Sequence, residues 1–129
     1  MEQLTLVETK DALRQPTSGG VLFSPVSKGF KLQYENQNGR LYQGNSFDWL
    51  ESLDDASVDL VFADPPYNIK KAEWDNFDSQ EKYIEWSIEW IKQASRILKP
   101  TGSLYVCGFS EILADLKHPA SKYFKHCRW

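Results

Sequence analysis

The chain has 129 residues, 41% of them hydrophobic and 26% charged, which is the balance of one soluble globular domain rather than of a disordered or membrane-embedded chain. Fifteen Lys and Arg against 18 Asp and Glu give a formal net charge of -3, so no overall positive field attracts nucleic acid, and DNA binding would need a local patch or sequence outside this chain. Two cysteines without metal-ligand spacing and the lack of a long apolar run exclude a disulfide framework and a membrane span, and we expect a cytoplasmic protein without a metal site.

The N-terminal segment alternates short apolar pieces with Gly and Pro turn signals. We interpret residues 1–30 as an N-terminal arm and residues 31–129 as the folded domain. Within that domain, alternating apolar residues on either side of an Asn-Gly turn pair predict extended segments, with a strand ending near Gln43. Ser46 follows as the predicted cap of a short helix.

A second strand is predicted over residues 58–63, where the run Val-Asp-Leu-Val-Phe-Ala is mostly apolar and β-branched. Such runs are typical of parallel-sheet strands that helices cover on both faces. A long amphipathic helix follows, with a capping pair at Asp78 and Glu81 and an end within residues 99–102. The spacing thus predicts a strand, a crossover helix and a return to the sheet.

The rest of the chain continues the alternation of strands and helices. Its pattern predicts a third strand over residues 103–107, a helix that Ser110 caps and that runs through Leu116, and the opening of a fourth strand over residues 125–129. This order favours right-handed crossovers between parallel strands. We therefore predict an α/β fold with a doubly wound parallel sheet that is incomplete within this chain.

Two polar segments follow predicted strands, at the edge of the sheet where ligands bind in such folds. The pair Gly44-Asn45 follows the first strand, and an Asp-Pro-Pro-Tyr motif at residues 64–67 follows the second. We expect the two segments to lie near each other and to form the functional site.

The Asp-Pro-Pro-Tyr motif suits a ligand that donates hydrogen bonds, because its two prolines stiffen the turn and remove two N–H donors. The exocyclic amino group of adenine or cytosine is such a ligand. The Asp64 carboxylate and the Pro65 carbonyl can accept its hydrogens and leave the nitrogen lone pair free to attack an electrophilic methyl group, while Tyr67 offers a stacking surface for a flipped base. The alternative is an ordinary loop in which Asp64 caps a turn and the prolines only stiffen it.

Other aromatic and basic residues leave two interpretations open. Trp86 and Trp90 are four residues apart on the predicted long helix and are expected to pack against the sheet, whereas Trp74 follows the motif and is either a pocket residue or a packed one. The lysines at positions 70–71 and the basic stretch 117–128 are either phosphate contacts or solvated surface.

Three stretches of the chain, residues 41–50, 57–68 and 96–106, stand in a characteristic order and spacing. In these stretches the chain resembles the DNA N6-adenine and N4-cytosine methyltransferase family, particularly bacterial modification enzymes. The Asp-Pro-Pro-Tyr motif is the specific part of the match. The Leu-Lys-Pro-x-Gly-Ser helix end is common to many methyltransferase-like sheets and is weaker.

The resemblance implies a Rossmann-like methyltransferase fold with S-adenosylmethionine as the cofactor. It implies roles in the base and methyl-transfer site for Asp64, Pro65, Pro66 and Tyr67. It implies cofactor contacts for Gly44, Asn45, Ser46 and Asp64, the last near the methionine amino group. Because Gly-Asp is commoner than Gly-Asn in that family segment, Asn45 is alternatively a left-handed turn residue after Gly44.

The glycine-rich Phe-x-Gly-x-Gly turn of the family has no counterpart in the chain. In one family arrangement the catalytic motif precedes the target-recognition region and the cofactor motif, and the chain resembles the front of that arrangement. We therefore expect residues 31–129 to be a partial catalytic domain. Its expected partners are double-stranded DNA and either a missing C-terminal half or further copies of the chain in a homo-oligomer.

The favoured hypothesis is a site-specific, S-adenosylmethionine-dependent DNA methyltransferase of the restriction-modification type that acts on the N6 amino group of adenine. Asp rather than Ser at position 64 favours adenine. The alternatives are an N4-cytosine methyltransferase and a noncatalytic remnant that binds DNA or a protein partner. Related acceptor-rich turns also serve the methylation of RNA and of protein glutamine.

Overall fold

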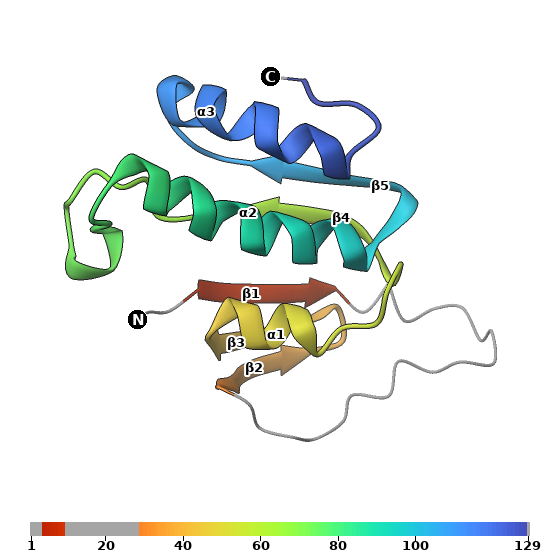
Figure 1. The fold of residues 1–129 in the computed structure, drawn as a ribbon. Coiled ribbons are helices and arrows are strands. Elements are labelled where there is room, and N and C mark those ends of the chain that lie inside the picture. Colours follow the sequence, from red (N-terminus) through yellow and green to blue (C-terminus); the bar gives the residue numbers. More distant parts are fainter. Residues whose placement is uncertain (1–3, 10–28, 129) are drawn as a thin grey trace.

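The strands form two separate sheets in the computed structural model, which describes residues 4–9 and 29–128. The first sheet is antiparallel, in the order β1-β3-β2, and consists of β1 Leu4–Thr9, β2 Phe30–Asn36 and β3 Gly39–Gly44. The second is a parallel pair, β4 Val58–Ala63 and β5 Leu98–Val106. The other described elements are the helices α1 Ser46–Glu51, α2 Gln80–Ile97 and α3 Ser110–Ala120, and the 3-10 turns η2 Glu73–Asp75 and η3 Ser121–Tyr123 (Figure 1).

The Asn-Gly turn pair closes a tight hairpin between β2 and β3. The Asn36 side chain stabilises it, because its Oδ1 accepts the N–H groups of Asn38 at 2.8 Å and Gly39 at 3.0 Å. The strand predicted to end near Gln43 is thus present as β3. Its place in a parallel sheet is wrong, however, because a tight turn returns the chain alongside itself and both neighbours of β3 pair with it antiparallel.

The parallel pair β4–β5 is joined by α2 and carries the core on its inner face. The two strands pair from Val58 opposite Leu98 to Ala63 opposite Val106. Inward side chains of the strands, Val61, Ala63, Leu104 and Val106, pack against buried residues of α2, namely Trp90, Ile91, Ala94 and Ile97. The crossover helix, the third strand and the packing role of Trp90 are confirmed. The predicted boundary between helix and strand is wrong, because α2 ends at Ile97 and β5 begins at Leu98, so residues 99–102 belong to the strand.

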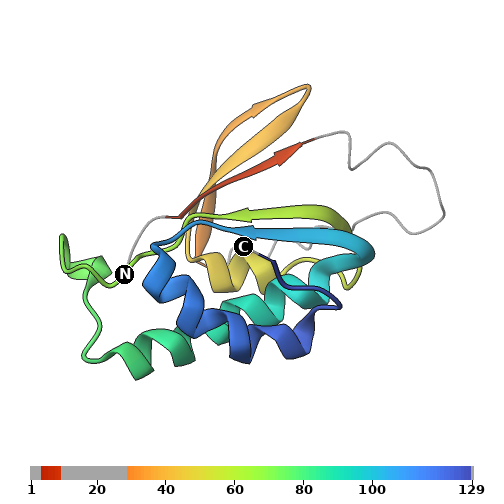
Figure 2. The same cartoon turned by 90° about the horizontal axis from the view of Figure 1, so that it is seen from above.

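The outer face of the same two strands is exposed. Leu60, Phe62 and Tyr105 are 57%, 68% and 60% exposed, because α1, α2 and α3 all lie on the opposite side of the pair (Figure 2). The prediction that helices cover both faces of β4 is therefore wrong for the described part of the chain. The structure is of the α/β class, with one helical layer and a small parallel sheet rather than a complete doubly wound sheet.

The N-cap residue of each helix precedes or follows the predicted cap by one position. Asn45, not Ser46, is the N-cap of α1, and Ser79, not Asp78, is the N-cap of α2, where its hydroxyl accepts the Lys82 N–H at 3.3 Å. The third helix begins at Ser110, so Phe109 and not Ser110 is its N-cap, and it continues beyond Leu116 to Ala120.

The structure differs from the predicted layout in its first and last parts. Leu4–Thr9, inside the predicted arm, is a strand that pairs with β3, while residues 10–28 lie outside the described part. The predicted boundary at residue 30 stays a prediction. Residues 125–128 form no strand, so the predicted fourth strand is wrong there, and Trp129 lies outside the described residues. No described helix has the length and apolar character to cross a membrane.

Candidate functional site

The Asp-Pro-Pro-Tyr motif begins where β4 ends. The Ala63 carbonyl still accepts a hydrogen bond from the Cys107 N–H at 2.8 Å, so the unpaired carbonyls begin at Asp64. The Pro66 carbonyl accepts the hydroxyl of buried Tyr83 at 2.8 Å. Among the described residues, none donates to the carbonyls of Asp64 and Pro65. Two unpaired backbone acceptors therefore lie beside the Asp64 carboxylate.

Tyr67 is held through both its hydroxyl and its ring. The hydroxyl donates to Asp64 Oδ1, and the ring meets Phe109 edge to face, with centroids 5.3 Å apart and planes at 71°. The hydrogen bond to Asp64, together with partial burial, raises the pKa of Tyr67 to about 12. At neutral pH the hydroxyl is thus a donor that orients Asp64 and cannot act as a base.

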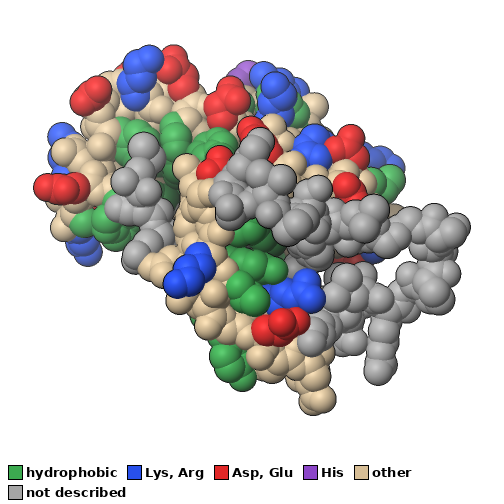
Figure 3. Space-filling model, turned by 90° about the horizontal axis from the view of Figure 1, so that it is seen from below, with side chains coloured by type: hydrophobic (Ala, Val, Ile, Leu, Met, Phe, Trp, Pro, Cys, Tyr) green, Lys and Arg blue, Asp and Glu red, His purple; other side chains and the backbone are tan. Residues whose placement is uncertain are grey.

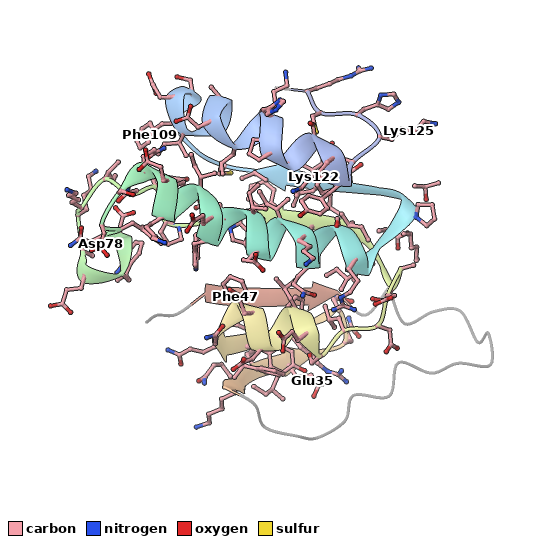
Figure 4. The ribbon with its side chains drawn as sticks, viewed as in Figure 1. Glu35, Phe47, Asp78, Phe109, Lys122 and Lys125 are labelled. Atoms are coloured by element: carbon pink, nitrogen blue, oxygen red, sulfur yellow. The ribbon has the colours of Figure 1, made fainter. Side chains whose placement is uncertain are left out.

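The motif shares one cavity with the segment that follows β3. The cavity has a volume of about 860 Å³, within the usual range of small-molecule sites. Its lining includes six of the seven predicted site residues, namely Asn45, Ser46, Asp64, Pro65, Pro66 and Tyr67. Gly44 is not part of the lining. Figure 4 shows Phe47, Asp78 and Phe109 at the same end of the molecule, where β4 and β5 finish.

Gly44 lies outside the cavity lining but determines the backbone conformation next to it. Its φ of +153° favours glycine, and a Cβ there would lie 2.2 Å from the Gly29 carbonyl oxygen and 2.4 Å from Phe30 Cα. This close approach lets the Asn45 N–H donate to the Gly29 carbonyl at 3.0 Å. Gly44 thereby sets the direction in which the chain enters the cavity.

Asn45 is both a structural residue and a cavity residue. Its φ of -75° and ψ of 120° are extended, so its interpretation as a left-handed turn residue is wrong. Its Oδ1 accepts the Phe47 N–H at 2.9 Å and caps α1. This cap fixes the first turn of α1, whose residues Ser46 and Phe47 line the cavity.

Five residues that line the cavity were not predicted to belong to the site, namely Phe47, Ile69, Asp75, Phe77 and Trp86. Three of them are aromatic, and the Trp86 ring centroid lies 6.1 Å from that of Phe47 and 5.1 Å from that of Phe77. Trp86 therefore fills space, as predicted, but next to the site. Asp75 is a buried acid in the loop after the motif, and composition and periodicity gave no signal for it.

Trp74, for which two roles were open, is 51% exposed and lines the cavity, so it is a pocket residue. Lys71 also lines the cavity, whereas Lys70 is exposed outside it. Of the basic stretch, Lys125 lies toward the end of the molecule away from the motif (Figure 4). On the face seen in Figure 3, the described charges of both signs are interspersed and form no single basic patch. The described residues contain no group of three potential metal ligands.

Comparison with known proteins identifies the class to which this fold and site belong. Residues 58–127 match the family model of N6/N4 DNA methylases. This match covers more than half of the chain and includes β4, the motif, α2, β5 and α3. The chain belongs to the DNA N6-adenine and N4-cytosine methyltransferase family.

Individual relatives come from several bacteria. The chain is 40% identical over 67 residues to the type II methyltransferase M1.MboII of Moraxella bovis, which covers 52% of this chain and 26% of that protein. It is 32% identical over 112 residues to M2.LlaDCHI of Lactococcus lactis subsp. cremoris, covering 75% and 39%, and 33% identical over 98 residues to the DNA adenine methyltransferase YhdJ of Escherichia coli K12, covering 71% and 32%. The chain thus spans between about a quarter and two fifths of the length of these relatives.

Proposed function

We propose that the chain carries the target-base site of an S-adenosylmethionine-dependent DNA methyltransferase that modifies the N6 amino group of adenine. The observation that carries the proposal is the acceptor-rich turn at the end of β4, which opens into the same cavity as the segment after β3. A base amino group has two N–H donors to offer to such a turn.

The cavity also fits the cofactor in its chemistry. Asn45 and Ser46 supply polar groups, Phe47 and Trp86 supply apolar walls, and Asp64 supplies a carboxylate for an ammonium group. These residues would hold the adenosyl and methionine parts. S-adenosylmethionine, when bound, supplies a methyl carbon attached to a positively charged sulfur, which leaves with the bonding electron pair.

The motif residues position the nitrogen that is methylated. Oδ1 of Asp64 is occupied by the Tyr67 hydroxyl, so Oδ2 and the Pro65 carbonyl are the acceptors for the two amino hydrogens. These hydrogen bonds turn the nitrogen lone pair toward the methyl carbon, and the new N–C bond forms with that pair. The methylated nitrogen would then release one of its protons to water and return to neutrality. Tyr67, held by Phe109, gives the base a surface on which to stack.

Two observations support adenine over cytosine. Position 64 carries Asp rather than Ser, and one relative is named as a DNA adenine methyltransferase. Double-stranded DNA as substrate and pairing with a restriction enzyme are part of the same proposal, because the other relatives reported above are named type II methyltransferases.

The proposal is tested by methyl transfer from labelled S-adenosylmethionine to unmethylated bacterial DNA, followed by mass spectrometry of the nucleosides. The expected product is N6-methyladenine. N4-methylcytosine as the only product would overturn the choice of base. Neither product, combined with no cofactor binding in calorimetry, would favour the noncatalytic remnant.

A matched pair of variants controls for charge and stability. Asp64→Asn replaces one acceptor oxygen with a donor and is expected to lower turnover about 100-fold or more, by analogy with other electrostatic catalytic groups. Asp54→Asn makes the same change at an exposed site distant from the cavity lining and is expected to have no effect. Equal turnover of the two variants would remove Asp64 from the mechanism.

A further inference from the structure

A buried carboxylate lies beneath the loop that follows the motif. Asp75, at the end of η2, is 2% exposed and pairs with no basic side chain in the described part of the chain. Its Oδ1 accepts the N–H groups of Tyr67 and Asn68, both at 2.7 Å. Its Oδ2 accepts those of Ile69 at 3.2 Å and, more weakly, of Lys71 at 3.5 Å.

The backbone is shaped around this carboxylate. Asn68 and Lys70 have φ of +57° and +58°, a conformation that L-residues rarely adopt and that costs free energy unless surrounding contacts hold it. Residues of alternating hand turn successive N–H groups toward one point and form a concave anion site. The Lys70 N–H completes the set by donating to the Asp75 carbonyl at 3.0 Å. The loop is thus an anion site filled by the chain's own side chain.

The consequence for the motif is an asymmetry between donors and acceptors. Pro65 and Pro66 have no N–H, and the next two N–H groups, of Tyr67 and Asn68, are both bound to Asp75. The turn therefore presents acceptors to the cavity and withholds its donors. A ligand with an amino group finds partners there, whereas a ligand with a carbonyl oxygen in the same place finds none.

We propose that Asp75 is a positioning residue that makes the motif selective for an amino group over a carbonyl group, by binding the backbone donors that would otherwise face the ligand. This inference rests on the proposed function and adds a determinant of base choice to it. In this role Asp75 acts through the Tyr67 and Asn68 amides.

The test compares two ligands that differ at one position. Deoxyadenosine has an amino group where deoxyinosine has a carbonyl oxygen, and both are titrated into the ¹⁵N-labelled chain while the Tyr67 and Asn68 amide resonances are followed. The wild-type chain is expected to prefer deoxyadenosine at least about tenfold. Asp75→Asn is expected to reduce this preference to about twofold or less, while the resonances of β4 and α2 keep their positions.

Asp78→Asn is the matched control, since Asp78 is exposed, belongs to the same connection and undergoes the same change of charge. It is expected to keep the wild-type preference. An Asp75→Asn chain that folds and still prefers deoxyadenosine would overturn the proposal, because Asp75 would then only stabilise the loop. A wild-type chain without any preference would overturn it as well.

A measurement on the wild-type chain keeps the proposal falsifiable if Asp75→Asn does not fold. Hydrogen exchange at the Tyr67 and Asn68 amides is expected to be slow and unchanged when deoxyadenosine is bound, because Asp75 keeps both N–H groups. Faster exchange on binding would show that the ligand competes for them and would contradict the proposal.

Failure of this inference differs from failure of the proposed function. Selective nucleoside binding without methyl transfer to DNA would contradict the function and leave the role of Asp75 standing. Methyl transfer together with an Asp75→Asn chain that keeps the wild-type preference for deoxyadenosine would leave the function standing and contradict the role of Asp75.

Discussion

The Tyr67 hydroxyl donates a hydrogen bond to Oδ1 of Asp64, three residues earlier in the same turn. The two residues most characteristic of the motif are thus partners before any ligand enters. Asp64 keeps its second oxygen for the ligand, and Tyr67 keeps its ring in place through Phe109. Variants can therefore test the contributions of the hydroxyl, the ring and the carboxylate separately.

The titration of Tyr67 reports directly on this partnership. The raised pKa of about 12, against an ordinary 10, means that the fold favours the neutral hydroxyl. The associated stability is fully present below pH 10 and is lost as the pH rises from 10 to 12. Asp64→Asn is expected to lower the Tyr67 pKa toward 10, as measured from the ¹³Cζ shift of labelled tyrosine. A pKa that stays near 12 would show that the hydrogen bond is not its cause.

The ring of Tyr67 is expected to matter more than its hydroxyl. Tyr67→Phe keeps the stacking surface and the contact with Phe109, and loses one hydrogen bond worth about 0.5–1.5 kcal/mol, so methyl transfer should fall about tenfold at most. Tyr67→Ala also loses base stacking worth about 1–3 kcal/mol and should fall further, to about 100-fold or more. A Phe variant as impaired as the Ala variant would assign the main role to the hydroxyl.

Arg96 of α2 is expected to be a main link between the helices that flank the cavity. Its guanidinium donates to the carbonyls of Leu50 at 2.8 Å and Leu53 at 2.9 Å, at the end of α1, and pairs with Asp55 at 2.5 Å. Arg96→Met should lower the free energy of unfolding by about 1–3 kcal/mol in urea titrations, because carbonyl acceptors lose a charged donor. Exposed Lys92 on the same helix provides the control, and Lys92→Met should change stability by less than about 0.5 kcal/mol.

Because the helices cover only one face of β4, substitutions at adjacent positions of this strand should differ in how much they destabilise the fold. Phe62 is 68% exposed, so Phe62→Ala should change the free energy of unfolding by about 0.5 kcal/mol or less. Val61 packs against the core, and Val61→Ala should cost about 1–2 kcal/mol. Thermal unfolding of the two variants provides the measurement. A larger loss at position 62 would mean that the chain buries its outer sheet face in solution.

The sequence was informative wherever a local pattern determines the outcome. The apolar run of β4, the period of α2 and the two prolines of the motif act on their own neighbours, so the strand, the crossover helix and the turn could be predicted. Pairing between distant strands is not encoded in such patterns. The placement of β3 between β1 and β2, rather than beside β4, could therefore not be read from residues near Gln43.

Within the site, the contacts of Asp75 could not be predicted from local sequence patterns either. Its role depends on N–H groups from four earlier residues that converge only because Asn68 and Lys70 adopt positive φ. Composition and periodicity do not indicate that convergence. The predicted cavity residues after β3 and β4 came together because both segments leave their strands at the same end of the molecule.

The cap at the start of α1 gives the cavity a direction. Because Asn45 uses its oxygen to bind the Phe47 N–H, its NH2 group is the part left for a molecule in the cavity. One end of the cavity therefore donates and the other, at Asp64 and Pro65, accepts. A molecule with complementary ends can lie between them in only one orientation, which the fold itself determines.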